Sequence, residues 1–240
     1  MPKILKVKDS ADGFHKKMPV FDLPMRILLN SKSQHGIGKT TIILNLLLNP
    51  EFGYDKVFKG ENIYIVSDND QDEKLKLLAK YKDIPEQNIM KYNESDLISL
   101  YDEIEEKFEE EKSDKDIQQR LIIMDDVGYS GKMKSKQFGI IAKLVSNGRH
   151  VALSQIYTSQ RLNMTPGTLR SQITGACFGT CSMRELEMIE NDFNYLDSKK
   201  SFIKMFRKHT EESRSFICIN FTGNAGLYYD REFKPIKMDK

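Results

Sequence analysis

A glycine-containing segment between two apolar runs carries residues suited to binding a nucleoside triphosphate. It reads SQHGIGKTT and holds Gly38, Lys39 and Thr40 in succession. In a phosphate-binding loop, G-x-x-x-x-G-K-[ST], backbone N–H groups cradle the phosphates, the lysine reaches the β and γ oxygens, and the hydroxyl binds Mg²⁺. We therefore predict a nucleotide site made of Ser33, Gln34, His35, Gly36, Ile37, Gly38, Lys39, Thr40 and Thr41.

The loop departs from the usual pattern at its first position, where Ser33 replaces glycine. Such a residue costs about 1–2 kcal/mol if its backbone must be left-handed, and nothing otherwise. The phosphate ligands come from the later positions of the loop. We therefore expect the loop to bind phosphate despite the replacement.

Two adjacent carboxylates end a later apolar run, RLIIMDD, over residues 120–126. A buried parallel strand that ends in Asp125 brings this carboxylate to the edge of the sheet where the phosphate loop lies. There Asp125, together with Thr40, is predicted to hold Mg²⁺. Asp126 follows directly and is predicted to be the base that orients the attacking water.

The positioning elements follow from apolar runs that alternate with amphipathic segments. Strands without polar alternation, separated by helices, predict a mostly parallel sheet covered on both faces. Expected strands span 25–30, 62–67, 89–93, 120–126, 150–160 and 175–180, and expected helices span 40–49, 72–81, 95–111, 136–148, 166–172, 182–194 and 198–209. The runs 215–221 and 226–230 predict a C-terminal hairpin at one edge of the sheet.

One domain over residues 1–240 is the expected organisation, because the chain length suits a single α/β core. Within it we expect an N-terminal arm over 1–20, a motor core over 21–181, and C-terminal helices with the hairpin over 182–240. No apolar run approaches the roughly 20 residues that span a bilayer, so we expect neither a membrane protein nor a secreted one.

An extra strand and helix separate the phosphate loop from the acid pair. This spacing resembles P-loop NTPases of the additional-strand catalytic-acid type, in which an acid follows the metal ligand. In that division the next strand supplies a polar group that senses the γ-phosphate, which implies Gln160; Gln155 is the rival, although its mid-strand position suits packing better. The sequence has no N-K-x-D guanine-reading motif, so ATP is the expected nucleotide.

The segment NGRHVALSQIYTSQRLNMTPGTLRSQ makes the resemblance more specific. A G-R-H triplet, an apolar strand, an S-Q pair, and then a proline and an arginine are similar to a block of the viral genome-packaging ATPases of the FtsK/HerA superfamily. These enzymes serve large nucleocytoplasmic DNA viruses and virophages. The segment LIIMDDVG also resembles their metal-binding strand, and the likeness covers roughly residues 25–181.

The resemblance implies an ATP-hydrolysing translocase that packages double-stranded DNA. Its members form a ring, usually a hexamer or pentamer, with ATP and Mg²⁺ at subunit boundaries and capsid proteins as partners. The family block points to Arg149 and Arg170 as candidates for the arginine that completes a neighbour's site, with Arg161 also nearby. Each of these arginines could instead bind DNA phosphate or form a local ion pair. The implied location is the cytoplasm or nucleus of an infected cell, with virion association as a further expectation.

Charge is unevenly placed along the chain, although the net charge is only +2. No Asp or Glu occurs between Val127 and Arg184, whereas residues 102–116 are strongly acidic and predict the solvated face of a helix. The lysines of GYSGKMKSKQ are predicted to contact DNA phosphates without reading bases; they are Lys132, Lys134 and Lys136. Ordinary solubilising lysines are the alternative.

Three other functions use the same loop chemistry: a helicase or DNA-mobilisation ATPase, a nucleotide-dependent switch that hydrolyses slowly, and a small-molecule kinase. Stimulation of hydrolysis by duplex DNA separates a motor from the switch and the kinase. Strand separation on forked DNA separates a helicase from a packaging motor. The lack of an obvious lid or acceptor-binding segment favours the motor over the kinase.

Overall fold

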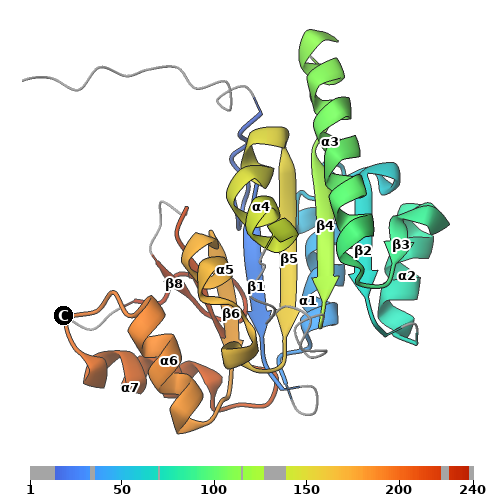
Figure 1. The fold of residues 1–240 in the computed structure, drawn as a ribbon. Coiled ribbons are helices and arrows are strands. Elements are labelled where there is room, and N and C mark those ends of the chain that lie inside the picture. Colours follow the sequence, from blue (N-terminus) through green and yellow to red (C-terminus); the bar gives the residue numbers. More distant parts are fainter. Residues whose placement is uncertain are drawn as a thin grey trace, which may run out of the picture.

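A mostly parallel sheet runs through the computed structural model, which describes residues 14–32, 36–69, 71–114, 116–126, 139–222 and 227–237 (Figure 1). Its strand order within this part of the chain is β3-β2-β4-β5-β1-β6-β7-β8. The strands are β1 (Arg26–Asn30), β2 (Ile63–Ser67), β3 (Ile89–Met90), β4 (Arg120–Asp125), β5 (Leu153–Ser159), β6 (Gly175–Gly179), β7 (Phe216–Asn220) and β8 (Tyr228–Tyr229).

Helices cover both faces of the sheet. On one face lie α1 (Lys39–Leu48) and α2 (Glu73–Lys82), whose apolar side chains share a core with Phe21 and Leu23. The other face is covered by α3 (Glu94–Asp114), α4 (Gly139–Asn147), α5 (Gly167–Gln172), α6 (Met183–Phe193) and α7 (Lys199–Thr210). None of the helices described is long and apolar enough to cross a bilayer. The predicted α/β class is confirmed.

Strand direction decides where functional side chains can meet. Strands β1 to β6 pair in parallel, whereas β7 and β8 run antiparallel to their neighbours and form the predicted C-terminal hairpin. Strand β5 lies between β1 and β4, with Asn30 opposite Ser159 and Met124 opposite Tyr157. The strand that the sequence places between the loop and the acid pair, β2, lies on the other side of β4. The carboxyl ends of β1, β5 and β4 therefore share one edge of the sheet.

Strand β5 begins later than its sequence suggests. The segment Gly148–Val151, named η6, is a 3-10 helix, and Ala152 follows with a left-handed φ of 54°. A Cβ on Gly148 would lie 2.3 Å from Nε2 of Gln155. The tight packing of this turn explains why the β-branched and aromatic pattern becomes a strand only from Leu153 onward.

Segments near both ends of the chain pack against the fold where the structure describes them. Phe14 is buried, and its carbonyl accepts a hydrogen bond from Nε2 of Gln119 at 2.9 Å. Near the other end, Pro235 forms an isolated bridge with Tyr229, and the N–H of Ile236 donates to the carbonyl of Tyr228 at 2.9 Å. These contacts hold the two segments against the fold. In each, a backbone group makes a hydrogen bond within the protein that it would otherwise make with water.

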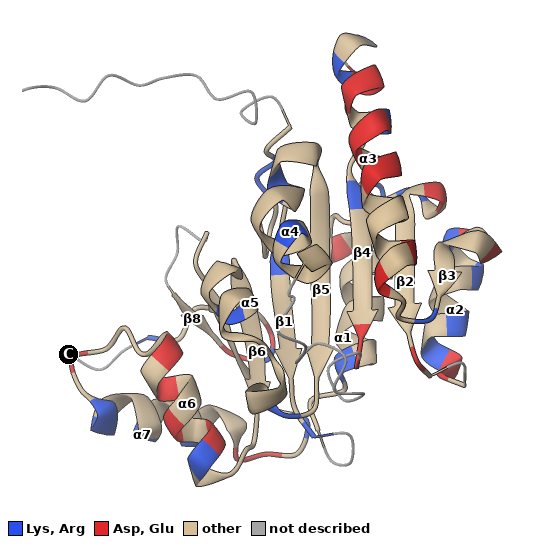
Figure 2. Cartoon of the chain, in the orientation of Figure 1, with Lys and Arg blue, Asp and Glu red and all other residues tan. Residues whose placement is uncertain are grey.

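Acidic residues occur along much of helix α3 (Figure 2). Lys143 on α4 faces them, with Nζ 3.3 Å from Oδ1 of Asp102 and 3.1 Å from Oε2 of Glu105. The same ammonium lies 4.3 Å from the ring centroid of Tyr101. One lysine of the acid-free segment is therefore paired with the acidic helix and is not part of an open basic surface.

A buried ion pair fixes the start of β4. The Arg120 side chain is fully buried, and its guanidinium contacts the carboxylate of Glu111 at the end of α3, with Nη1 3.1 Å from Oε2. Nη1 also donates to the carbonyl of Gln118 at 3.2 Å. Because this arginine is out of water, Glu111 is its principal source of charge compensation.

Replacing Glu111 with alanine is expected to lower the free energy of unfolding by about 3–5 kcal/mol, because a buried guanidinium loses its counter-charge. Glu110→Ala, at an exposed position one residue earlier, should stay within about 0.5 kcal/mol of the native value. Urea denaturation of the full chain measures both. Equal losses from the two variants would contradict the assigned role of the Arg120 pair.

Candidate active site

Residues 33–35 of the phosphate loop lie outside the described structure. Two glycines shape the part of the loop that is described. Gly38 has φ 75° and caps the start of α1, a left-handed conformation that favours glycine. A Cβ on Gly36 would lie 1.9 Å from the carbonyl oxygen of Lys32. The N–H of Ile37 donates to Oγ of Ser31 at 3.2 Å, which holds the loop against the end of β1.

Lys39 lies over the start of the loop and is largely buried. Its Nζ donates to the carbonyl of Ser31 at 3.0 Å and lies 4.0 Å from Oδ1 of Asp126. A flexible four-carbon stem lets this ammonium move between a backbone carbonyl and a phosphate oxygen. Lys39, the lysine of the predicted motif, therefore lies close to Asp126, the predicted catalytic acid.

Asp125 is buried at the end of β4, and its Oδ1 accepts a hydrogen bond from the Thr158 hydroxyl at 2.7 Å. Burial raises the pKa of this carboxyl above its usual range, and the nearby charges of Asp126 and Asp72 add to the shift. The Thr158 hydrogen bond and the Lys39 charge oppose it. A buried carboxylate among like charges gains most from a bound cation.

Asp126 turns out of the strand with a left-handed φ of 51°. Its N–H donates to the Thr158 hydroxyl oxygen at 2.9 Å, and its Oδ2 accepts from Nε2 of Gln160 at 2.8 Å. Oδ1 is buried without a hydrogen-bond partner among the described residues. Positive φ at a residue other than glycine and a buried acceptor without a hydrogen-bond donor are both costly, and such features concentrate at functional sites.

Oxygen atoms suited to Mg²⁺ gather beside the loop. The Thr40 hydroxyl donates to Oδ2 of Asp72 at 3.3 Å, and both residues line a cavity with Asp125. Hydroxyl and carboxylate oxygens are the donor set that Mg²⁺ prefers, and the buried carboxylate of Asp125 needs a cation. The residues therefore fit the predicted metal, which Thr40 and Asp125 would hold, with Asp72 beside them.

Six of the predicted residues share one cavity of about 330 Å³ at the carboxyl edge of the sheet: Gly38, Lys39, Thr40, Asp125, Asp126 and Gln160. Residues that follow the ends of four strands, and residues from the starts of α1 and α2, line it: Lys32, Gly38, Lys39, Thr40, Asn69, Asp72, Lys74, Asp125, Asp126 and Gln160. Sequence reasoning missed Asp72, which caps α2 by accepting from the N–H groups of Lys74 and Leu75. The polar run SDNDQD directly after the strand 62–67 is the signal that could have identified it.

The two predicted arginines lie away from this cavity. Arg149 is exposed on η6, before β5, and therefore lies toward the opposite edge of the sheet. The Nε of Arg170 contacts Oδ2 of Asp192 at 2.7 Å, and its Nη1 donates to the carbonyl of Thr165 at 2.8 Å. Arg170 is thus engaged in a local ion pair, the alternative left open by the sequence.

Gln155 packs inside the fold, since its Nε2 donates to the carbonyl of Leu144 at 2.6 Å and its Oε1 accepts from the Tyr157 hydroxyl at 2.5 Å. This mid-strand residue is therefore a core side chain. Gln160, directly after the strand, is the one that reaches the cavity. The predicted DNA-contacting residues Lys132, Lys134 and Lys136 lie outside the described residues.

Comparison with protein families gives one match. Residues 15–225 match the model of a family described as "Poxvirus A32 protein". The match spans the phosphate loop, the acid pair, Gln160 and most of the C-terminal segment. No curated protein matches the sequence significantly.

Solved structures with a similar fold include viral and bacterial NTPases. The genome-packaging NTPase B204 of Sulfolobus turreted icosahedral virus 2 in complex with sulfate is 17% identical, with 90% of this chain and 98% of that chain covered and a TM-score of 0.58. Its complex with ATP-gammaS gives 18% identity, coverage of 89% and 98%, and a TM-score of 0.56. EssC (ATPases 2 and 3) from Geobacillus thermodenitrificans is 12% identical, with coverage of 74% and 36% and a TM-score of 0.53.

Replacing Asp125 with asparagine is expected to raise the melting temperature in buffer without nucleotide or metal by roughly 2–4 °C, the shift that about 1 kcal/mol gives in a chain of this size. The pKa of Asp125 is raised, so at neutral pH its charge opposes folding, and asparagine removes the charge while keeping an acceptor for Thr158. Differential scanning calorimetry measures the change. The exposed Asp197→Asn is the control, and a lower melting temperature for Asp125→Asn would contradict the argument.

Proposed function

The chain belongs to the poxvirus A32 protein family of viral genome-packaging ATPases within the FtsK/HerA superfamily, and from this we propose that it hydrolyses ATP to move double-stranded DNA into a capsid. The observation that carries the proposal is the convergence of Lys39, Thr40, Asp125, Asp126 and Gln160 on one cavity. Similar folds that bind ATP-gammaS and AMPPCP support a nucleoside triphosphate as the ligand.

The phosphate end of ATP is proposed to enter between the loop and the acid pair. Backbone N–H groups at the start of α1 point toward this space and favour negative charge. Lys39 would leave the Ser31 carbonyl and contact the β and γ oxygens, since its 3.0 Å hydrogen bond to a neutral acceptor is the weaker interaction. Mg²⁺, when held by Thr40 and Asp125, would neutralise charge on the same oxygens.

Asp126 is proposed to orient the attacking water. Its Oδ2 is held by Gln160 at 2.8 Å, which leaves Oδ1 as the acceptor for the water proton. The Thr158 hydroxyl fixes the Asp126 backbone at 2.9 Å, so the carboxylate is positioned before substrate arrives. Gln160 then lies beside both the base and the proposed position of the γ-phosphate. It is therefore close enough to respond when hydrolysis changes the charge at that position.

We expect a ring, a hexamer or pentamer, in which a neighbouring subunit completes the site. Arg149 suits the role of the completing arginine better than Arg170. Its guanidinium is exposed and has no carboxylate partner among the described residues, whereas Arg170 is paired with Asp192. An arginine in this role can contribute about 10³- to 10⁵-fold in rate.

Duplex DNA and capsid proteins are the proposed partners, and the infected cell, with the virion as a further site, is the proposed location. Lys132, Lys134 and Lys136 are proposed to contact DNA phosphates. Contacts of this kind give affinity without sequence preference, as a motor that moves along any genome requires.

Lys39→Ala and Asp126→Asn are each expected to lower the ATPase rate by about 100-fold or more, since one loses phosphate charge compensation and the other loses the base. A steady-state phosphate-release assay, with and without duplex DNA, measures the effect. The exposed Lys56→Ala should hydrolyse ATP at the native rate. If neither site variant reduces hydrolysis, or duplex DNA does not stimulate the native chain, the proposed function is wrong.

Removing the three loop lysines, in Lys132→Ala, Lys134→Ala and Lys136→Ala together, should flatten the salt dependence of DNA binding. Each lost phosphate contact lowers the slope of log K against log salt by about 0.9. Fluorescence anisotropy with labelled duplex DNA at several salt concentrations measures the slope. A triple variant at the exposed residues Lys56, Lys59 and Lys80 should leave it unchanged. An unchanged slope in the loop variant would remove these lysines from the DNA-binding surface.

A further inference from the structure

The C-terminal segment of the chain packs directly against the phosphate loop. Ile37 is buried against the end of β6, so closely that a Cβ on Gly179 would lie 2.4 Å from its Cγ2. Phe216, the first residue of β7, is paired with Gly179. The turn between α7 and β7 is therefore brought beside the loop, although more than 170 residues separate them in sequence.

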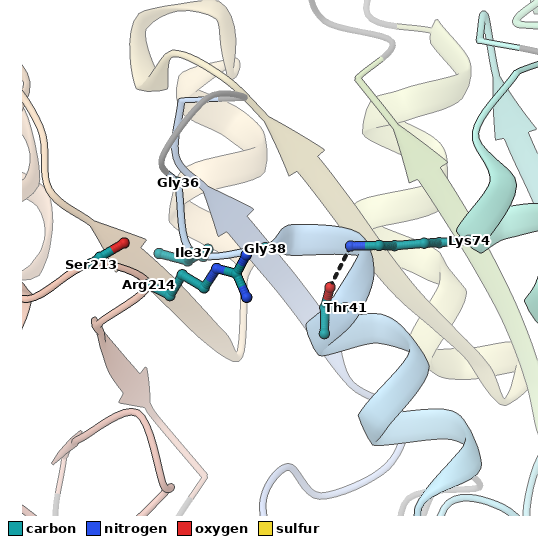
Figure 3. A pocket seen from close by; sticks show the side chains of 7 residues that line it. All are labelled: Gly36, Ile37, Gly38, Thr41, Lys74, Ser213 and Arg214. Carbon is teal, nitrogen blue, oxygen red and sulfur yellow. Dashed lines mark hydrogen bonds between the residues drawn. The ribbon is translucent and has the colours of Figure 1, made fainter.

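A second cavity, of about 320 Å³, lies between this turn and the loop (Figure 3). Its lining residues are Gly36, Ile37, Gly38, Thr41, Lys74, Ser213 and Arg214. It shares Gly38 and Lys74 with the cavity that holds Asp125 and Asp126, but neither acid lines it. The two cavities therefore adjoin at the start of α1, one with the hydrolytic residues and one without them.

Arg214 projects from the turn toward Gly38 (Figure 3). Its φ is 62°, a left-handed conformation that few residues with a side chain adopt. Among the described residues its guanidinium has no hydrogen-bond or ion-pair partner, and the side chain is exposed. The guanidinium is thus free to bind a ligand. Strained backbone at a residue other than glycine is also more common at ligand-binding sites.

The turn that carries Arg214 is anchored on both sides. The N–H of Ser215 donates to the carbonyl of Glu212 at 3.1 Å, which closes the turn. Nη1 of Arg231 lies 3.2 Å from Oε2 of Glu212 and 3.4 Å from Oγ of Ser215. The backbone hydrogen bond closes the turn around Arg214, and Arg231 links the residues on its two sides.

Lys74 supplies a second cation across the same cavity. It lies in the first turn of α2, and its Nζ donates to the Thr41 hydroxyl at 2.7 Å (Figure 3). Arg214 and Lys74 therefore lie on either side of the N-terminus of α1, whose own partial charge is positive. Three positive groups around an uncharged glycine turn suit an anionic ligand.

We propose that Arg214 binds the α-phosphate of the nucleotide, with Lys74 opposite it, and that the second cavity holds the nucleoside end. The inference rests on the proposed function: a triphosphate whose γ-phosphate lies by Asp126 must run past Gly38, and its other end then enters the adjoining cavity. A planar guanidinium can contact two phosphate oxygens at once. The C-terminal segment thereby contributes a nucleotide ligand of its own.

A contact with the α-phosphate is made equally by ADP and ATP, so it affects binding and not the chemical step. Arg214→Ala should raise the dissociation constants of ADP and of the non-hydrolysable analogue AMPPCP by the same factor, about 10- to 100-fold, because a charged hydrogen bond is lost. KM for ATP should rise by a similar factor with kcat nearly unchanged. Arg214→Lys keeps the charge but not the planar guanidinium, so its affinity for both nucleotides should lie between those of the native chain and the alanine variant.

Isothermal titration calorimetry of the full chain with ADP and AMPPCP, without DNA, tests the proposal. Arg207→Ala, at an exposed arginine of α7, is the matched control and should bind both as the native chain does. Equal melting temperatures exclude misfolding as the cause of any loss. Unchanged affinity in Arg214→Ala, or a loss confined to AMPPCP together with a lower kcat, would overturn the α-phosphate assignment.

These titrations, together with the phosphate-release assay, separate this inference from the proposed function. If the native chain binds and hydrolyses ATP but Arg214→Ala binds ADP normally, only the inference fails. If the native chain does not hydrolyse ATP yet binds ADP through Arg214, the motor proposal fails and the inference stands. A native chain that binds neither nucleotide overturns both.

Discussion

The hydroxyl of Thr158 holds the candidate site together. It donates to the Asp125 carboxylate at 2.7 Å and accepts from the Asp126 N–H at 2.9 Å, so one oxygen fixes both acids against the neighbouring strand. This bridge exists because β5 lies between β4 and β1 and runs parallel to both. With that order, the polar residues at the end of each strand reach the same edge of the sheet, beside the N-terminus of α1.

The site carries costs that a purely structural arrangement would avoid. Asp125 is buried beside two other carboxylates, Asp126 has a left-handed backbone, and its Oδ1 has no hydrogen-bond partner in the described part of the chain. Each feature opposes folding by an amount that a bound cation, phosphate or water would offset. The apolar faces of the sheet supply the stability that tolerates these costs, since both are covered by helices.

The C-terminal segment forms a wall beside the phosphate loop. Strand β6 lies next to β1, and its Gly179 allows Ile37 to pack closely; β7 follows β6, so the turn before β7 meets the loop. Arg214 and the acid pair, Asp125 and Asp126, are then on opposite sides of the start of α1. A nucleotide that spans both cavities would contact the core and the C-terminal segment together.

The sequence by itself determined the α/β fold, the phosphate loop and the acid pair, because local apolar runs define strands and adjacent motif residues stay adjacent in space. Only the tertiary structure decided which distant side chains join them. Asp72 and Arg214 reach the loop because sheet order places their segments there. Lys143 and Arg170 lie in the stretch without acids, yet each is paired with an acid from another helix. Charge acts through space, so a one-dimensional pattern cannot show which cations remain free.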